Sequence, residues 1–531
     1  MKKFDVIIIG SGIGGLSTAV FLSKVFNKRV LVLEQHYKLG GLTHEFKRII
    51  NGIEYNWDVG LHYVGKMQKG EMARHLFDYV SNRNVKWKKM PHIFEIFKYP
   101  KYTFKVPSNH NEYLEKLISE FPEEKNSLIT YFKDLKDVST WTLKKISPNF
   151  FPFFLNIWLR LSAKSHNKIG SLTTKEYLDL RFNNNKLKSL LASQWGNYAL
   201  SPQKSSFATH ALVVNSYLNG GFYPIGGSDI ISESLIPSIT KNGGECLRNH
   251  SVSEIIIENK KAVGVKVDIT KGKNISQENF KADIIISSVG AVDTFTKLLP
   301  NNTIHSNISE INSFPKEQSI STLYIGLKES PEKLGVKGEN YWIYDSFNHD
   351  EIANDSEAIL KGKIRSAYLS FPSLKNPKSK GHTAEISNII SYDIFKKWKD
   401  EKWMNRGEDY LKFKEKITNS YLDLIEENIK GFKDLVAYTE LSTPLSIRHF
   451  TQKNKGEMYG VPAIPRRLDL NWLKPKTEIK NLYLTGSDVA SHGIIGALIG
   501  GLLTASMIGG KLGIFKIIYK IIQFSKEKHS K

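Results

Sequence analysis

The sequence predicts an α/β fold built around a parallel sheet, and two local patterns predict it. Residues 6–9 form an apolar run that leads directly into a glycine-rich turn at 10–15, and a second apolar run occupies 30–33. Short, continuous apolar runs suit strands that are buried on both faces. A strand, a tight glycine turn and a helix that follows at once are the parts of a Rossmann-type dinucleotide-binding domain.

The glycines of this turn are Gly10, Gly12, Gly14 and Gly15, and Glu34 closes the second apolar run. Glycine lets the backbone turn tightly and approach a pyrophosphate, which the free N–H groups of the helix N-terminus bind. A carboxylate at the end of the second strand accepts hydrogen bonds from ribose hydroxyls. Because strand, glycines, helix and acid occur in register, we expect a dinucleotide site, and a chance glycine turn is the weaker interpretation.

A second glycine pair, Gly40 and Gly41, favours FAD over NAD as the dinucleotide. An extended cofactor needs the backbone to pass close to it a second time, and glycine allows that approach. The sequence therefore predicts that this pair, six residues beyond the ribose-binding acid, also contacts the cofactor.

The distal part of the chain repeats the order of strand, glycine turn and helix. Residues 481–488 include Gly486 and Asp488, and a helix is expected to begin near Gly493 and Gly496. Asp488 is the candidate ligand for ribityl hydroxyls, and the positive end of the helix can face the pyrimidine edge of a flavin. A helix that packs through its small residues is compatible with the same glycines.

The intervening segments predict an α+β substrate domain that is interleaved with the FAD-binding domain. A hairpin at 252–257 and 262–267 and a buried strand at 282–287 return the chain to the sheet. Ser228 is the expected N-cap of a helix over 229–241. The expected FAD-binding pieces are 1–90, 221–310 and 456–510, the substrate pieces are 91–220 and 311–455, and 511–531 is a basic amphipathic tail.

Composition describes an ordinary globular protein. The 531 residues are 40% hydrophobic and 24% charged, which is enough chain for two domains and a large core. A single cysteine, Cys246, excludes an internal disulfide and a cysteine-based metal site and is compatible with a reducing compartment. The histidines and acids show no spacing typical of metal ligands, so we expect no metal.

The net charge of +22 calls for an anionic partner. Nucleic acid is not expected, because the lysines are spread along the chain and no nucleic-acid module is present. An anionic membrane surface fits better, since the apolar segments 150–161 and 511–524 are both too short to span a bilayer and the second carries interspersed lysines. A terminal helix packed on the body is the alternative for the second segment.

The N-terminal apolar run is interpreted as a sheet strand and not as the core of a signal peptide, because glycines stand where a cleavage region would fall. No apolar run reaches the length of a membrane-spanning helix. The sequence therefore predicts a cytoplasmic protein that associates peripherally with a membrane.

Four phrases carry a resemblance to a known family. They are 33–41 (LEQHYKLGG), 58–65 (DVGLHYVG), 210–227 (HALVVNSYLNGGFYPIGG) and 482–489 (LYLTGSDV). Together they resemble the family of retinol saturases, carotenoid isomerases and phytoene desaturases, over residues 4 to about 510. The resemblance implies an FAD enzyme that acts on carbon–carbon double bonds of a long apolar polyene at a membrane. Saturation is the expected reaction, and cis–trans isomerisation or desaturation at the same flavin site are the alternatives.

His62 and Tyr63 are the candidate residues for positioning or protonation near the flavin ring, since they lie between Gly60 and Gly65. Structural hydrogen bonding is the competing interpretation of this pair. No second nucleotide motif with its own strand and helix appears, so the electron partner stays open among a quinone, oxygen, a redox protein and NAD(P)H as an external reductant.

Two other classes of function compete with a polyene-active enzyme. A membrane-bound lipid carrier that keeps FAD as a structural element is opposed by the intact Glu34 and Asp488. An amine oxidase on the same fold is opposed by the length of the family resemblance.

Overall fold

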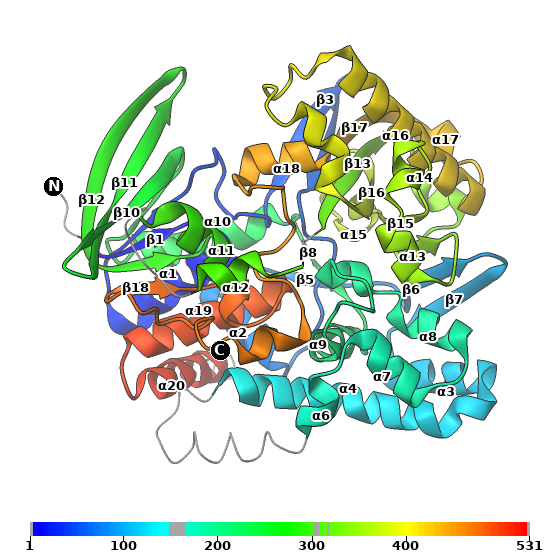
Figure 1. Ribbon diagram of the computed structural model, residues 1–531, viewed down its shortest axis with the longest axis horizontal. Coiled ribbons are helices and arrows are strands. Elements are labelled where there is room, and N and C mark those ends of the chain that lie inside the picture. Colours follow the sequence, from blue (N-terminus) through cyan, green and yellow to red (C-terminus); the bar gives the residue numbers. More distant parts are fainter. Residues whose placement is uncertain (1–3, 148–165, 301–306, 316–317, 528–531) are drawn as a thin grey trace.

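Figure 1 shows the computed structural model, which describes residues 4–147, 166–300, 307–315 and 318–527. One sheet with its helices forms the part at the left, a second sheet lies at the upper right, and a layer of helices runs along the lower right. The predicted apolar segment 150–161 lies outside the described residues.

The first sheet has the strand order β10-β11-β12-β1-β2-β9, with β18 paired to β12. β1 (Phe4–Ile9) pairs in parallel with β12 (Asn274–Ser287) and with β2 (Val30–Leu33). β9 (Glu245–Leu247) and β18 (Leu482–Leu484) extend the parallel set. Every residue of β2 is buried, as expected for a strand covered on both faces. The predicted α/β class is confirmed.

The predicted hairpin is present as β10 (His250–Glu258) and β11 (Lys261–Lys271), which pair antiparallel. β11 also pairs antiparallel with the first part of β12, whose last residues lie beside β1. The predicted strand 282–287 is therefore the inner end of a longer strand that belongs to both the hairpin and the parallel sheet.

Helices cover one face of this sheet. They are α1 (Ile13–Phe26), α2 (Met72–Val80), α10 (Asp229–Thr240), α19 (Gly493–Ile508) and α20 (Gly513–Lys526). Their apolar side chains form one buried cluster with those of β1 and β2. This packing brings segments from the two ends of the sequence together at the first glycine turn.

Ser228 occupies the predicted N-cap position of α10, but its side chain forms no capping hydrogen bond. Ser228 precedes the helix but already has helical dihedral angles, φ −71° and ψ −27°, whereas an N-cap side chain needs an extended backbone to reach the next N–H groups. Its own N–H donates to Asp58 Oδ1 at 3.1 Å, and its hydroxyl is buried without a hydrogen-bond partner.

The second sheet has the order β17-β13-β16-β15-β14-β6-β7. Alternate residues of its strands point to opposite faces. One face is apolar and packs on α16 (Gly407–Asn428), and the other carries aromatic and polar side chains. The strands are β17 (Val436–Ser442), β13 (Ser319–Leu327), β16 (His382–Ile390), β15 (Ser366–Ser370), β14 (Asn340–Tyr344), β6 (Ile93–Tyr99) and β7 (Tyr102–Pro107).

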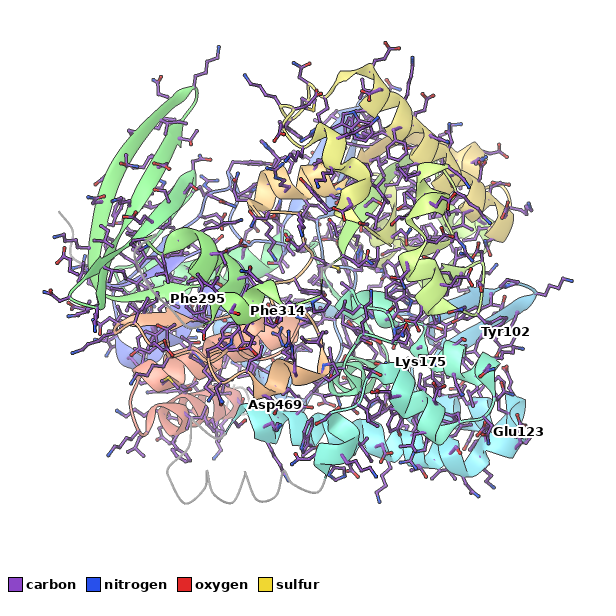
Figure 2. All side chains as sticks on the ribbon, in the orientation of Figure 1. Tyr102, Glu123, Lys175, Phe295, Phe314 and Asp469 are labelled. Atoms are coloured by element: carbon purple, nitrogen blue, oxygen red, sulfur yellow. The ribbon has the colours of Figure 1, made fainter. Side chains whose placement is uncertain are left out.

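A layer of helices packs beside this sheet around a cluster rich in Phe, Tyr and Trp. Its helices are α3 (His110–Glu120), α4 (Lys125–Ile146), α7 (Thr174–Arg181), α8 (Asn185–Ala192) and α9 (Phe207–Tyr217). Lys145 at the end of α4 forms an ion pair of 2.5 Å with Asp469, which is labelled in Figure 2. This contact joins the layer to the segment that leads into β18.

The remaining elements are short and connect these layers. They are β3 (Glu45–Ile50), β4 (Ile53–Asp58), β5 (Trp87–Lys89), β8 (Phe222–Pro224), α6 (Asn167–Gly170), α11 (Ala291–Asp293), α12 (Ile308–Asn312), α13 (His349–Asn354), α14 (Ser356–Leu360), α15 (Pro372–Lys375), α17 (Phe432–Leu435) and α18 (Pro444–Thr451).

The C-terminal helix α20 has two apolar faces. Ile514, Ile517 and Ile521 are buried against the body. Phe515 and Tyr519, which are 42% and 59% exposed, lie on the outer side with other apolar residues. Across the described residues, no helix is long and apolar enough to cross a membrane.

Candidate active site

The first glycine turn is packed tightly everywhere except at one position. A Cβ on Gly14 would lie 2.4 Å from Cα of Gly486, and one on Gly15 would lie 2.3 Å from the carbonyl oxygen of Gly10. A Cβ on Gly41 would lie 2.8 Å from Cα of Gly12. A Cβ on Gly12 itself would meet no atom within 4 Å. The start of α1 therefore faces open space at Gly12, bordered by the second glycine pair.

Glu34 is anchored at the edge of this space. Its Oε2 accepts hydrogen bonds from the N–H and the hydroxyl of Ser11, at 2.9 and 2.6 Å, and its Oε1 accepts one from the N–H of His36 at 2.9 Å. The N–H of Gly40 donates to the Ser11 hydroxyl oxygen at 3.0 Å. Sequence reasoning missed Ser11, whose position inside the glycine turn was the available signal.

The distal segment joins the same region, as the sequence predicts. Asp488 accepts hydrogen bonds from the N–H of Ala291 at 2.7 Å and of Val461 at 3.0 Å. Both carboxylate oxygens of Asp488, the residue predicted to bind the ribityl hydroxyls, thus hold loops of the protein in place, and each oxygen retains a further lone pair. Its contact with ribityl hydroxyls stays a prediction.

The glycines of α19 serve two different purposes. A Cβ on Gly500 would lie 2.0 Å from the carbonyl oxygen of Gly486, and one on Gly496 would lie 1.9 Å from that of Ser491. A Cβ on Gly493, at the start of the helix, would meet no atom within 4 Å. Small residues therefore pack most of the helix, while its first turn is open.

His62 lies against a buried carboxyl group. Its Nδ1 is 3.0 Å from Oε2 of Glu385, although neither atom is aligned for a hydrogen bond. Burial lowers the pKa of His62 to about 4 and raises the pKa of Glu385 to about 8. Both shifts favour the neutral forms, so this is a neutral contact and not an ion pair.

Lys375 and Asp58 complete a buried polar cluster around His62. The Lys375 ammonium donates to the carbonyl oxygen of His62 at 3.0 Å, to Asn340 Oδ1 at 2.5 Å and to Ser370 Oγ at 2.7 Å. Burial lowers the pKa of Lys375 to about 7 and raises that of Asp58 to about 7. The N–H of Asp58 donates to Glu385 Oε1 at 2.8 Å. Sequence reasoning missed this cluster, because its members meet only in the folded chain.

Tyr63 points to the opposite side of this turn. Its hydroxyl donates to Glu95 Oε1 at 2.6 Å and accepts a hydrogen bond from Asn197 Nδ2 at 3.2 Å. The carbonyl oxygen of Asn197 accepts a hydrogen bond from the Tyr459 hydroxyl at 2.8 Å, and the Tyr459 ring stacks on His492, which immediately precedes α19. Two hydrogen bonds and one ring stack thus connect Tyr63 with the predicted flavin-binding end of α19.

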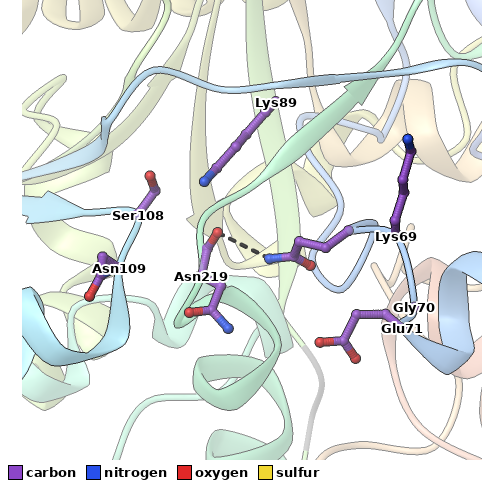
Figure 3. A pocket seen from close by; sticks show the side chains of 8 residues that line it. Lys69, Gly70, Glu71, Lys89, Ser108, Asn109 and Asn219 are labelled. Carbon is purple, nitrogen blue, oxygen red and sulfur yellow. Dashed lines mark hydrogen bonds between the residues drawn. The ribbon is translucent and has the colours of Figure 1, made fainter.

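Figure 3 shows a surface cleft of about 550 Å³ beside this region. Gln68 crosses it and donates to the carbonyl oxygen of Asn219 at 3.1 Å. The lining is polar and includes Lys69, Glu71 and Lys89, but none of the predicted cofactor residues. The cleft is therefore not the predicted nucleotide site, and its polar lining does not suit a long apolar polyene.

Comparison with known proteins first defines the class. Residues 8–80 match the NAD(P)-binding Rossmann-like domain. Putrescine oxidase bound to putrescine has a TM-score of 0.61 at 13% identity, covering 96% of this chain and 99% of that chain. Cyclohexylamine oxidase from Brevibacterium oxydans IH-35A has a TM-score of 0.60 at 15% identity, covering 96% and 100%. These structures share the fold: a Rossmann-like nucleotide domain with a mixed-sheet substrate domain.

Sequence similarity then defines the family. All-trans-retinol 13,14-reductase of Danio rerio is 32% identical, covering 96% of this chain and 86% of the relative. A Danio rerio protein described as inactive all-trans-retinol 13,14-reductase is 28% identical, covering 95% of this chain and 86% of the relative. Prolycopene isomerase of Daucus carota is 26% identical, covering 97% of this chain and 81% of the relative. The chain belongs to the retinol saturase and prolycopene isomerase family of FAD-dependent oxidoreductases.

Proposed function

We propose that this chain saturates a carbon–carbon double bond of a long apolar polyene of the retinol or carotenoid kind. The observation that carries the proposal is the 32% identity across 96% of the chain to an all-trans-retinol 13,14-reductase. Cis–trans isomerisation is the second candidate, supported by the 26% identity to prolycopene isomerase. Desaturation at the same flavin site is the third.

The residues at the glycine turns fit FAD. Ser11 and Glu34 would hold the adenosine ribose, because each carboxylate oxygen of Glu34 has acceptor capacity left. The open backbone at Gly12 would admit the pyrophosphate to the N-terminus of α1. The N-terminus of α19 would face the pyrimidine edge of the flavin. Bound there, FAD would supply hydride transfer.

Saturation also needs a proton, and Tyr63 is the better donor of the two predicted residues. Burial lowers the pKa of His62 to about 4. At neutral pH its imidazole is therefore uncharged, and its remaining N–H is a very weak acid. Burial raises the pKa of Tyr63 well above its usual value, so its hydroxyl stays protonated. The Tyr63 side chain is buried, and the rings of Tyr217 and Tyr368 stack beside its ring.

The electrons come from an external donor in this proposal, since the sequence has no second nucleotide motif. NAD(P)H, a redox protein and a quinone are the candidates. We also propose that the protein is cytoplasmic and binds anionic membranes peripherally through the outer face of α20, where apolar side chains alternate with lysines.

The reaction type follows from product mass. Chemically reduced enzyme is mixed without oxygen with all-trans-retinol and, separately, with a cis-carotenoid. We expect a gain of two hydrogens with stoichiometric flavin reoxidation. A change of retention time without a change of mass would select the isomerase, and a loss of two hydrogens with oxidised enzyme would select the desaturase. An unchanged flavin spectrum with every polyene would favour the lipid carrier.

A further inference from the structure

Glu95, in β6, has a carboxyl group with no exposure to solvent. Its Oε1 accepts hydrogen bonds from the Tyr63 hydroxyl at 2.6 Å and the Trp342 indole at 3.0 Å, and its Oε2 accepts one from the Gln194 amide at 2.6 Å. All three donors are neutral. Among the described residues, none forms an ion pair with this carboxyl group, so its negative form lacks a direct counter-charge.

The groups that face Glu95 allow it to change protonation near neutral pH. Burial raises the pKa of Glu95 to about 7, against the opposing effect of its three hydrogen bonds. Lys375 acts on it from a distance, and because burial lowers the pKa of Lys375 to about 7, the charge of this amine changes in the same pH range. The other titratable groups facing it are phenols with raised pKa values, which stay protonated: Tyr63, Tyr113, Tyr217, Tyr344 and Tyr368.

The hydrogen bonds of Tyr63 have a fixed direction. Asn197 Nδ2 donates to the Tyr63 oxygen, so the single hydroxyl hydrogen of Tyr63 is directed at Glu95 as long as that carboxyl group is ionised. A protonated Glu95 can donate to the Tyr63 oxygen instead. The hydroxyl hydrogen of Tyr63 is then free to point elsewhere in the site.

We infer that Glu95 is a positioning residue: when protonated it frees the Tyr63 hydroxyl proton for delivery to the substrate, and it then replaces that proton. The inference rests on the proposed saturation. One carbon of the double bond would take up the hydride that bound, reduced FAD supplies, and the other carbon would take up the Tyr63 hydroxyl proton. The O–H bond of Tyr63 breaks as the new C–H bond forms, and the proton of Glu95 restores the hydroxyl. After the product has left, one proton taken up from the solvent that refills the substrate site returns Glu95 to its protonated form, so charge and atoms balance.

The first test reads protonation directly and needs no activity. The infrared carbonyl band of a protonated carboxyl group is followed from pH 5 to pH 9 in the parent and in Glu95→Gln. We expect a band that is lost near pH 7 in the parent and is missing from the variant. Glu339→Gln is the matched control, because Glu339 is also buried and accepts a tyrosine hydroxyl, that of Tyr341, at 2.8 Å.

Two outcomes of this titration decide the inference. A parent-minus-variant spectrum without such a band overturns the inference, and this result does not depend on which substrate the enzyme uses. If Glu95→Gln does not fold, Tyr63→Phe replaces it, because loss of the Tyr63 hydrogen bond must shift the same band. An unshifted band in Tyr63→Phe also overturns the inference.

The second test uses turnover. We expect kcat for polyene reduction to fall as pH rises through about 7, because ionised Glu95 binds the Tyr63 hydrogen. Glu95→Gln should flatten this profile and lower kcat by a factor on the order of 10² with little change in KM, while Tyr341→Phe leaves both unchanged. A pH profile that persists in Glu95→Gln contradicts the inference. A parent that reduces no polyene contradicts the proposed function, and the infrared result still stands.

Discussion

Glu34 combines burial with a defined set of donors, and this makes its role testable by one substitution. Glu34→Arg would place a cation beside Ser11, remove the acceptors for the ribose and leave β2 otherwise unchanged. We expect a loss of FAD affinity of about 2–4 kcal/mol. Flavin absorbance per chain after purification measures it. Glu258→Arg, at an exposed residue of β10, is the control, and equal flavin content in both variants would exclude the assignment.

The buried carboxyl group of Glu385 predicts a pH-dependent stability. Its pKa is raised from 4.5 to about 8 in the folded chain, so the folded state binds an extra proton between these values. The favourable contribution is complete below pH 4.5 and is lost as pH rises through about 8. Relative to the parent, Glu385→Gln should therefore gain roughly 4 kcal/mol between pH 5 and pH 9. Denaturant unfolding at both pH values checks this, and a constant difference would contradict it. Exposed Glu258→Gln should show no such change.

Individual residues of the candidate site differ in how far the sequence alone predicts their role. The role of Glu34 is predictable because its partners lie in one local motif. Glu95 is not predictable in this way, because it receives its hydrogen bonds from Tyr63, Gln194 and Trp342, which are far apart in the chain. The sequence predicts His62 and Tyr63 as a pair, but their opposite directions, toward Glu385 and Glu95, follow from tertiary packing alone.

At the scale of elements, the parallel strands and α19 were predictable because continuous apolar runs and glycine turns are local signals. Strand β16 was not predictable. Its polar residues Thr383, Glu385 and Ser387 alternate with apolar residues, and they lie on a face that is buried. That face is covered by other parts of the chain, and a sequence pattern does not reveal which face will be covered.

Two glycine substitutions should separate cofactor binding from packing. Gly12→Ala adds a methyl group that meets no atom, so the fold should keep its stability while FAD affinity falls. Gly500→Ala places a methyl group 2.0 Å from the carbonyl oxygen of Gly486, so stability itself should fall by about 1–3 kcal/mol. Thermal unfolding and flavin content are measured for both. Equal destabilisation by the two substitutions would contradict this distinction.

The outer face of α20 can be tested without disturbing its inner face. The double variant Phe515→Ser, Tyr519→Ser removes exposed apolar area and leaves Ile517 in the core. We expect unchanged flavin content and weaker binding to anionic vesicles. The binding that remains should weaken further at high salt, because salt screens the lysine charges. Leu180→Ser, at a residue of α7 that is 64% exposed, is the control. Equal sedimentation of parent and variant with vesicles would refute the membrane contact.

At the scale of the whole molecule, the candidate site lies where the nucleotide sheet, the second sheet and the helical layer meet. Glu95 comes from the second sheet, Asn197 from the helical layer and Tyr63 from the connection after β4, and the three residues share hydrogen bonds. The interleaving of two domains was predictable from the return of glycine and strand signals late in the sequence. The order of the second sheet was not, because its strands pair across long separations.

We expect this interlocking to make unfolding cooperative. Loss of the second sheet removes the contacts that hold the turn after β4, so FAD release and loss of tertiary structure should occur in one transition. Flavin fluorescence and circular dichroism, followed against denaturant concentration, measure the two events. A flavin release that is complete before the ellipticity changes would contradict this expectation.

The hydrogen bond of 2.8 Å between Thr18 on α1 and Thr485 after β18 joins residues 467 positions apart. At ordinary rates of protein synthesis, α1 leaves the ribosome roughly 20–90 s before its partner segment exists. During that interval the surface of α1 that later packs against α19 is uncovered, and it includes the apolar residues Leu16 and Val20. The nascent chain therefore presents an incomplete apolar surface for most of its synthesis, which makes α1 the expected binding site for chaperones.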